Sequence, residues 1–371
     1  MRNADCLRTL PDADTSAMVN LSTNDYLGLN DRPGLWDEFL SGFTPSTRSM
    51  SAASSRLLTG NHPEYRRLED SLRSLYGGRA ALVFNCGYHA NAGVLPALAD
   101  KADVVIADKL IHASIIDGMR LCAANGTRVL RFNHNDMAHL RRLLGQVASP
   151  NAGRVFVVVE SIYSMDGDVA PLAELTELRR EFGFWLYVDE AHAVGVRGRH
   201  GEGLVGELGL LPDVDIVVGT CGKALASEGA WVISSDTVRQ WLVNKCRTLI
   251  FTTGLPPVNV AWTEFIVRRM ADMQAERANL AALGDWLTVS LGGSAPEGGA
   301  TQIVPFLCGE NAEAVRLSLL ARKAGFYVLP IRHPTVPKGQ ARLRLSLKAS
   351  ISRTELEPLV KLLLAEKKNI L

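Results

Sequence analysis

The fold of this 371-residue chain is decided by one stretch, Asp215-Ile-Val-Val-Gly-Thr-Cys-Gly-Lys-Ala-Leu-Ala-Ser-Glu-Gly-Ala-Trp-Val-Ile233. Apolar runs at 214–218 and 230–233, joined by a turn of small residues, predict two buried strands of one sheet. The turn places Lys223 at the carboxyl end of the first strand, where open α/β sheets bind their ligands. Burial of a lysine amine away from water lowers its pKa and favours the neutral, nucleophilic form that Schiff-base chemistry requires. The alternative is that Lys223 is a solvated turn residue, as most lysines beside glycine are.

A second apolar run, residues 186–188, ends in the sequence Asp-Glu-Ala-His (189–192). In enzymes that use pyridoxal 5'-phosphate (PLP), a carboxylate keeps the ring nitrogen protonated so that the ring can take up a carbanion's electrons. Asp189 fits that role, and a simple cap of the next segment is the alternative interpretation. The four residues also resemble a helicase metal-binding box, but the sequence contains no G-x-x-x-x-G-K-[ST] phosphate loop to accompany it.

Composition sets limits on the class of protein. With 47% hydrophobic and 21% charged residues, the chain can bury a large core and form two or more structural units. A formal net charge of +1, without a basic run interleaved with aromatics, argues against a nucleic-acid partner. The six cysteines are scattered, which predicts a reduced cytoplasmic protein without disulfides or a zinc or other metal site. Apolar runs such as 155–159 are too short to span a membrane.

From about residue 81 onwards, strand-like and helix-like patterns alternate along the chain, which predicts a mostly parallel, doubly wound α/β sheet. The expected strands are 81–84, 104–107, 129–132, 155–159, 185–188, 216–218 and 230–233. The expected helices are 63–75, 91–98, 113–124, 136–147 and 172–181.

A long helix at 257–287 is then expected to lead into a smaller α/β unit with strands near 303–307 and 341–347. We therefore expect an N-terminal arm (1–26), a large domain (27–268) and a small C-terminal domain (269–371).

Nine motifs follow one another in the order of a known family. They are Asn-Asp-Tyr-Leu-Gly-Leu (24–29), Ser-Arg-Leu-Leu-Thr-Gly-Asn-His (55–62), Cys-Gly-Tyr-His-Ala-Asn (86–91), Asp-Lys-Leu-Ile-His-Ala-Ser (108–114), Ser-Met-Asp-Gly-Asp (164–168), Asp-Glu-Ala-His (189–192), Gly-Thr-x-Gly-Lys (219–223), Phe-Thr-Thr (251–253) and Pro-Thr-Val-Pro (334–337). Over nearly its whole length the chain resembles the α-oxoamine synthases, which are PLP-dependent enzymes of fold type I. The resemblance implies an aspartate aminotransferase-like α/β fold, PLP as cofactor, and a homodimer with shared active sites.

The resemblance also implies roles for individual residues. Lys223 is expected to bind PLP as a Schiff base and to move the substrate's α-proton, Asp189 to pair with the ring nitrogen, and His112 to stack on the ring. The other expected cofactor contacts are Gly87, Tyr88, Ser164, His192, Thr220 and, from the neighbouring chain, Thr252 and Thr253. Without the resemblance, His112 is interpreted as the cap of a helix that begins near residue 113, and Ser164 as a turn residue.

The substrate site is expected to contain Asn24, Arg344, Thr335, Arg332 and Arg8. Asn24 and Arg344 correspond to positions that hold the amino-acid carboxylate, because a guanidinium makes the paired bonds that a carboxylate accepts. Since Arg342 and Arg344 share one face of a strand, a solvated stripe is the alternative.

The implied reaction is condensation of L-alanine with a pimeloyl thioester, on CoA or an acyl carrier protein, with loss of CO₂. The alternatives are a sibling enzyme that uses glycine, such as 2-amino-3-ketobutyrate CoA ligase, and a PLP-binding protein without catalytic activity.

Overall fold

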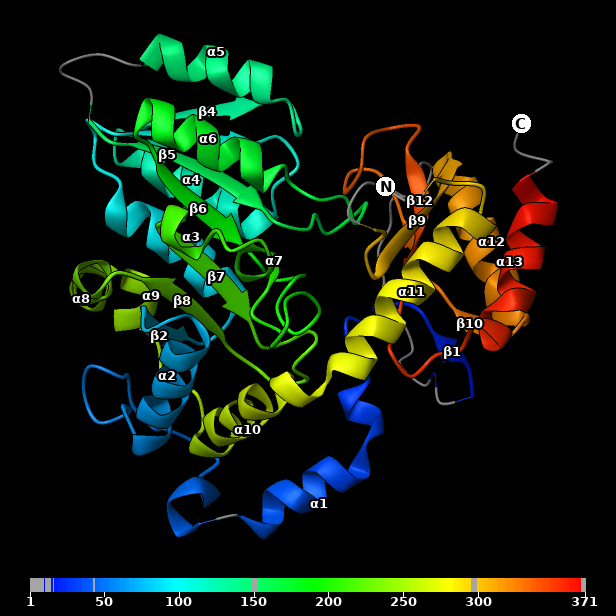
Figure 1. Cartoon of the computed structure of the whole chain (residues 1–371), viewed down its shortest axis with the longest axis horizontal. Helices are drawn as coiled ribbons and strands as arrows, with labels where there is room; N and C mark the ends of the chain where they lie inside the picture. The colour runs from blue at the N-terminus through cyan, green and yellow to red at the C-terminus, as the bar shows by residue number, and fades with distance from the viewer. Residues whose placement is uncertain are drawn as a thin grey trace. The chain divides into compact units, whose positions relative to one another are not determined.

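The computed structural model describes residues 10, 15, 17–42, 44–147, 153–294 and 299–367. The chain divides into two compact units (Figure 1). The larger consists of Leu29–Tyr163 and Val169–Gln274, and the smaller of Met1–Gly28, Ser164–Asp168 and Ala275–Leu371. The smaller unit is therefore assembled from three separate parts of the sequence.

The larger unit is built on a sheet that contains seven strands among the described residues, in the order β2-β8-β7-β6-β5-β3-β4 (Figure 1). They are β2 (Ala80–Phe84), β3 (Val104–Asp108), β4 (Arg128–Phe132), β5 (Val155–Glu160), β6 (Trp185–Asp189), β7 (Ile216–Thr220) and β8 (Ala230–Ser234). Strand β8 runs antiparallel to both of its neighbours, and the other neighbouring pairs are parallel. The expected mostly parallel sheet is confirmed, and all seven expected strands are present.

Helices connect these strands as the alternating pattern predicts. They are α1 (Pro33–Ser41), α2 (Pro63–Leu75), α3 (Gly87–Leu98), α4 (Ala113–Ala124), α5 (Met137–Val147), α6 (Leu172–Phe182), α7 (Leu204–Glu207), α8 (Asp236–Lys245), α9 (Arg247–Ile250) and α10 (Pro257–Arg269). The bounds expected for α2 and α4 are confirmed, whereas α3 begins earlier than residue 91. It does so because Cys86 caps the helix, its sulfur accepting a hydrogen bond from the N–H of His89.

The single long helix expected at 257–287 is wrong. Helix α10 ends at Arg269, a 3₁₀ turn, η5 (Met270–Asp272), follows, and α11 (Gln274–Ser290) then begins. Met270 and Met273 are buried, so the apolar periodicity continues through the break although the backbone leaves the helix. The break also coincides with the border between the two units.

The smaller unit has a three-stranded antiparallel sheet, in the order β11-β12-β9, and a two-stranded parallel sheet, β1-β10 (Figure 1). Its strands are β1 (Val19–Asn20), β9 (Ile303–Gly309), β10 (Phe326–Tyr327), β11 (Pro330–Ile331) and β12 (Ala341–Ser346). Its helices include α11, α12 (Asn311–Lys323) and α13 (Arg353–Lys367). All six residues of β12 are buried, which makes this strand the centre of the unit's core.

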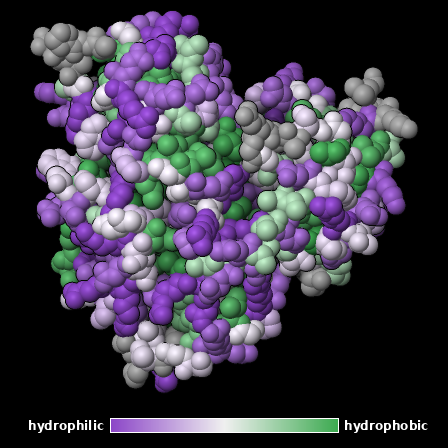
Figure 2. All heavy atoms as spheres, viewed as in Figure 1, coloured by the Kyte–Doolittle hydropathy of each residue, from purple (hydrophilic) through white to green (hydrophobic). Residues whose placement is uncertain are grey.

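Polar side chains cover much of the visible face of the larger unit, with smaller apolar patches between them (Figure 2). Large apolar residues that remain exposed in this unit include Trp36, Leu58 and Phe251. No helix in the described part of the chain combines the length and the apolar character needed to cross a bilayer.

Candidate active site

Three parallel strands of the larger unit each end in a buried acid. Asp108 ends β3, Glu160 ends β5 and Asp189 ends β6, with 0%, 2% and 3% of their surfaces exposed. The expected Lys223 lies just beyond the end of β7, half-buried, in a turn closed by a 3.0 Å hydrogen bond from the N–H of Ala226 to its carbonyl oxygen. Ala226 adopts φ +44°, a left-handed conformation that costs free energy in alanine, so this turn is held under strain.

Asp189 is fixed by two hydrogen bonds from neutral groups. The Asn91 amide donates to its Oδ2 at 2.6 Å, and the backbone N–H of Ala191 donates to its Oδ1 at 2.8 Å. Asn91 in turn accepts from the Tyr187 hydroxyl at 2.7 Å and donates to the Ser114 hydroxyl at 3.0 Å. Each carboxylate oxygen of Asp189 is thus held by one donor, and a protonated ring nitrogen requires such a carboxylate as its partner. Asn91 ends the motif 86–91, but the sequence alone does not predict this role for it.

His112 is the N-cap residue of α4, so its interpretation as a helix cap is correct. Its Nδ1 lies 3.2 Å from the backbone nitrogen of Ser114, which donates to it, and 2.7 Å from that residue's hydroxyl. Burial lowers the pKa of His112, the charge of Asp189 opposes this, and the charge of Lys223 adds to it. A neutral ring that accepts at Nδ1 carries its proton on Nε2, so capping leaves the face of the ring available for a flat ligand.

The N-terminus of α3 is shaped for an anion. The first N–H groups of a helix have no partner within it, and those of Gly87 and Tyr88 also lie at the positive end of the helix dipole. A Cβ atom at Gly87 would lie 2.6 Å from the methyl group of Thr220, so only glycine lets the helix approach the end of β7 so closely. The Thr220 hydroxyl donates to the carbonyl of Ala191 at 3.4 Å.

The loop that contains Thr252 and Thr253 is anchored beside this helix N-terminus. The Asn85 amide donates to the Thr253 carbonyl at 2.6 Å, and Thr253 forms an isolated β-bridge with Ser55. Thr252 is half-buried and Thr253 is exposed. The structure therefore brings the 251–253 segment next to the segment that opens α3.

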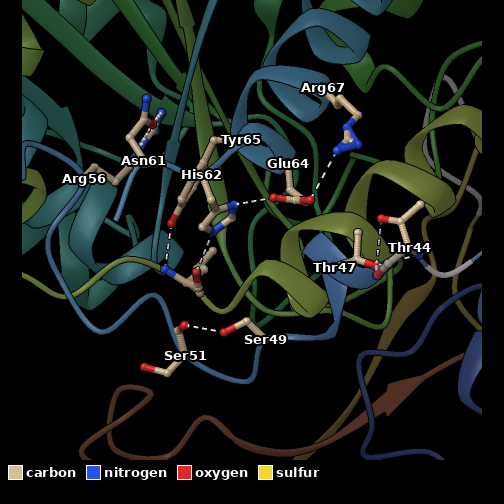
Figure 3. Close-up of polar contacts among 11 residues, drawn as sticks. Thr44, Thr47, Ser49, Ser51, Arg56, Asn61, His62, Glu64, Tyr65 and Arg67 are labelled. Carbon is tan, nitrogen blue, oxygen red and sulfur yellow. Dashed lines mark hydrogen bonds and ion pairs between the residues drawn. The ribbon is translucent and has the colours of Figure 1, made fainter. Parts of the chain in front are cut away.

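Two aromatic side chains hold the end of the same loop, as Figure 3 shows. The Tyr65 hydroxyl accepts from the N–H of Leu255 at 2.6 Å, and Nε2 of His62 lies 3.0 Å from the carbonyl oxygen of Leu255. The other ring nitrogen of His62 lies 3.0 Å from Glu64, which is 1% exposed and also pairs with Arg67. His62 ends the motif 55–62, and its contact with residue 255 could not be predicted from the sequence.

Two more expected cofactor contacts belong to different units. His192 lies in the turn after β6 of the larger unit, with 5% of its surface exposed. Ser164 belongs to the smaller unit, where its carbonyl oxygen accepts a 2.6 Å hydrogen bond from Nε of Arg344.

Arg344 is the centre of a buried cluster in the smaller unit. It donates to the Asn24 amide oxygen at 3.1 Å, to the Tyr26 hydroxyl at 3.2 Å and to the hydroxyl of Ser346, in addition to the Ser164 carbonyl. Among the described residues, every hydrogen-bond partner of Arg344 is thus neutral. Tyr26 was missed by the sequence analysis, although it belongs to the same motif as Asn24.

Arg342, two residues earlier on the same face of β12, has a different environment. It forms an ion pair with Asp166 and donates from Nε to the Gln340 carbonyl at 3.0 Å. Only 3% of Arg342 and 9% of Arg344 is exposed, so the alternative of a solvated stripe is wrong. Within the described part of the chain, these two arginines of one buried strand therefore differ: Arg342 has an anionic partner and Arg344 has none.

The remaining expected substrate residues lie in the loop between β11 and β12, or outside the description. The N–H of Thr335 donates to the carbonyl of Arg332 at 2.9 Å, and Thr335 is exposed whereas Arg332 is half-buried. Arg8 lies outside the described residues.

The arrangement in the larger unit fits PLP. The group has a phosphate, which suits the N-terminus of α3, where a side chain on Gly87 would fill the space. Its ring nitrogen requires a carboxylate such as Asp189, its flat ring suits the neutral imidazole of His112, and its aldehyde reacts with a lysine amine such as that of Lys223.

Comparison with known proteins agrees with this geometry. The family model described as "Aminotransferase class I and II" matches residues 16–363, so the chain belongs to the class I and II aminotransferase family. It is 47% identical to 8-amino-7-oxononanoate synthase of Haemophilus ducreyi, over 94% of this chain and 91% of that protein. It is 45% identical to 8-amino-7-oxononanoate synthase of Chlorobaculum parvum, over 92% of this chain and 88% of that protein.

Solved structures give the same fold. Serine palmitoyltransferase of S. paucimobilis with a bound PLP–myriocin aldimine superposes with a TM-score of 0.85 at 30% identity, over 95% of this chain and 88% of that one. The 8-amino-7-oxononanoate synthase of Francisella tularensis superposes with a TM-score of 0.79 at 24% identity, over 95% and 99%. The expected fold type I is confirmed.

Proposed function

We propose that the chain is an 8-amino-7-oxononanoate synthase, which uses PLP to condense L-alanine with a pimeloyl thioester in biotin biosynthesis. The observation that carries the proposal is the 47% identity to the Haemophilus ducreyi enzyme of that name over 94% of this chain. The products are 8-amino-7-oxononanoate, CO₂ and the free thiol of CoA or of an acyl carrier protein. We place the enzyme in the cytoplasm, because the five cysteines among the described residues are all free thiols.

The larger unit holds the cofactor in this proposal. Lys223 binds its aldehyde carbon, Asp189 its ring nitrogen and His112 one face of its ring. The N–H groups of Gly87 and Tyr88, with the hydroxyl of Thr220, bind the phosphate, and His192 and Ser164 bind the phenolic oxygen. When bound, PLP supplies a protonated ring that takes up the electron pair left on the α-carbon.

The amino group of L-alanine would replace Lys223 at the aldehyde carbon of PLP, and the freed Lys223 amine then removes the α-proton of L-alanine. The α-carbon forms a bond to the thioester carbonyl carbon, and the carbon–sulfur bond breaks to release the thiol. The carboxyl group of the former alanine leaves as CO₂, and a proton returned by Lys223 completes the product.

The smaller unit recognises the substrate carboxylate in this proposal. Arg344 and Asn24 bind it, and the support is the contrast with Arg342. A buried guanidinium with only neutral partners keeps its charge available for an anionic ligand, whereas one already paired with Asp166 does not. Thr335 and Arg332 close over the acyl chain, and Arg8 reaches the substrate.

A substrate matrix tests the proposed reaction. Purified protein is assayed with L-alanine, glycine and L-serine against acyl thioesters of short, pimeloyl and long chain length. We expect L-alanine with the pimeloyl thioester to give the highest kcat/KM. Preference for glycine would support the sibling enzyme, preference for serine would support the activity named for the structural neighbours, and PLP binding without turnover would support a non-catalytic protein.

Covalent trapping tests the role of Lys223 separately. Borohydride treatment of the yellow holoenzyme should reduce PLP onto Lys223, which peptide mass mapping identifies. A reduced adduct on another lysine would overturn this assignment.

We further propose a homodimer in which the hydroxyls of Thr252 and Thr253 bind the phosphate in the neighbouring subunit. The support is that the loop is anchored beside the N-terminus of α3, yet leaves Thr253 exposed and Phe251 70% exposed. A hydroxyl bonded to a phosphate contributes about 1.5–3 kcal/mol, so Thr253→Ala should weaken PLP retention about 10- to 100-fold.

Subunit exchange tests the shared site. Lys223→Ala and Thr253→Asp should each be inactive, because one lacks the amine and the other sets a negative charge against the phosphate. When the two variants are mixed and exchange subunits, activity should return. In each mixed dimer, one of the two sites receives Lys223 from one chain and Thr253 from the other, and is therefore intact. Mixed dimers verified by mass but without activity would contradict a shared site.

A further inference from the structure

Glu160 is a second buried acid directly beside Asp189. It is the last residue of β5, and the register of the parallel pair β5–β6 places it opposite Asp189. Residues in register on neighbouring parallel strands point to the same face of the sheet. Since the two side chains are 2% and 3% exposed, two carboxyl groups share one dry region at the carboxyl edge of the sheet.

The chain supplies these two carboxyl groups with unequal numbers of hydrogen-bond donors. Asp189 receives one donor on each oxygen, from Asn91 and Ala191. The backbone N–H of His112 acts to lower the pKa of Glu160, and the Oε1 of Glu160 is buried without a hydrogen-bond partner among the described residues. Two neighbouring carboxyl groups in a low dielectric do not both ionise, and the proton stays on the less well solvated one.

The surrounding charges favour the same distribution. Burial raises the pKa of Glu160 well above its usual 4.5, and the charge of Asp189 raises it further. The N–H of His112 and the charge of Lys223 oppose this, and Asp108 on β3 contributes a weaker effect in the raising direction. Asp108 is itself held as a carboxylate by His134, at 2.9 Å, and by the backbone N–H groups of Leu110 and Asn135.

We propose that Glu160 is a positioning residue that remains a neutral carboxylic acid, holding the backbone of His112 and leaving Asp189 as the single negative charge of the pair. The inference rests on the proposed roles of Asp189 and His112 in binding PLP. It assigns Glu160 two effects. It fixes the backbone position from which the imidazole of His112 extends, and it fills the space beside Asp189 with a group that adds no charge.

Two substitutions of similar size separate these effects in the holoenzyme. Glu160→Gln keeps a neutral side chain with a carbonyl oxygen for the N–H of His112, whereas Glu160→Leu removes the acceptor. We expect the pH midpoint of the absorbance of bound PLP to be the same in Glu160→Gln as in the parent. An ionised Glu160 predicts instead a lower midpoint in Glu160→Gln, because loss of a nearby negative charge destabilises protonated nitrogen at Lys223; that result would overturn the proposal.

Infrared spectroscopy detects a protonated carboxyl group directly. Above about pH 8, where Glu190 has released its proton, the parent holoenzyme should still show the carbonyl stretch of a buried protonated carboxylic acid, and Glu160→Gln should lack this band. Its persistence in that variant, or its absence from the parent, would overturn the neutral assignment. This measurement remains decisive even if Glu160→Leu fails to fold.

PLP retention tests the positioning of His112. Glu160→Leu should bind PLP about 10-fold more weakly than Glu160→Gln, because the proposed contact with the backbone N–H of His112 is lost. Equal retention by the two variants would overturn the positioning role. A protein that lacks PLP on Lys223 would contradict the proposed function, whereas a shifted midpoint in protein that carries PLP on Lys223 contradicts this inference alone.

Discussion

Each unit buries a pair of like-charged side chains, and the two units treat their pairs in parallel ways. In the smaller unit, Arg342 is neutralised by Asp166, and Arg344 is surrounded by neutral acceptors. In the larger unit, Glu160 is short of donors and keeps its proton, and Asp189 is surrounded by neutral donors.

In each unit one member of the pair has its charge neutralised, by an ion pair or by a proton, and the charge of the other member is preserved. A buried charge is costly unless it is paired, so a preserved one marks a place where a ligand supplies the opposite charge. The preserved charges are opposite in sign. Arg344 matches the carboxylate of an amino acid, and Asp189 matches the protonated nitrogen of PLP.

Removing the preserved negative charge should have the largest effect. Asp189→Asn keeps a side chain of the same shape but cannot hold the ring nitrogen protonated. We expect PLP to stay bound while kcat falls by about 10³-fold, the scale on which a preorganised electrostatic group acts. Exchange of the α-proton of L-alanine for solvent deuterium measures the affected step. An unchanged exchange rate would refute the role of Asp189.

Removing the preserved positive charge should have the next largest effect. Hydrogen bonds to charged groups contribute about 1.5–3 kcal/mol each, so Arg344→Met should lower kcat/KM for L-alanine by about 10²- to 10³-fold. The matched control is Arg342→Met on the same strand. It should leave KM for L-alanine nearly unchanged but lower the free energy of unfolding by about 1–3 kcal/mol, because Asp166, which is 33% exposed, loses its partner.

Steady-state kinetics of both variants measure KM and kcat/KM for L-alanine, and denaturant unfolding measures their free energies of unfolding. If Arg342→Met impaired L-alanine binding as strongly as Arg344→Met, the distinction between a paired and a preserved arginine would fail.

Another buried acid of the larger unit makes the stability of the protein depend on pH. Glu190 is fully buried, and its Oε1 accepts from the backbone N–H groups of Leu204 and Val205 at 2.9 and 3.1 Å. Burial raises the pKa of Glu190 from 4.5 to about 7. The native protein therefore binds a proton here that the unfolded chain releases. The resulting stability is complete below about pH 4.5 and is lost as pH rises through about 7, a change of about 3 kcal/mol.

Glu190→Gln should remove that dependence. The Tm of the parent should fall relative to that of the variant between pH 5 and pH 7, and the difference should level off above pH 7. Thermal unfolding of the two holoenzymes at a series of pH values measures it. Tm profiles that stay parallel over this range would show that Glu190 does not titrate as expected.

Sequence alone predicted those parts of the fold that repeat a pattern locally. The strands β5, β6 and β7 are continuous apolar runs, as buried parallel strands must be, so Asp189 and Lys223 could be placed at strand ends. The break after α10 escaped prediction because Met270 and Met273 continue the apolar periodicity through a 3₁₀ turn.

The relations between distant segments could not be predicted. Glu160 at the end of an apolar run is unremarkable until the strand order places β5 beside β6. The difference between Arg342 and Arg344 likewise depends on Asp166, which comes from a remote part of the sequence. The contact between Asn91 and Asp189 depends on how α3 packs against the end of β6, which the sequence does not show.

The three-part origin of the smaller unit has a consequence for synthesis on the ribosome. Its central segment, Ser164–Asp168, emerges long before the residues it contacts: the Thr301 hydroxyl donates to the carbonyl of Gly167 at 2.8 Å, and Asp166 pairs with Arg342. The first segment, Met1–Gly28, is synthesised even longer before its partner, because the N–H of Ala349 donates to the carbonyl of Tyr26 at 2.7 Å. The nascent larger unit can therefore collapse around its sheet while two short pieces of the other unit remain unpartnered. Translation of almost the entire chain must finish before the substrate-carboxylate pocket proposed around Arg344 can exist.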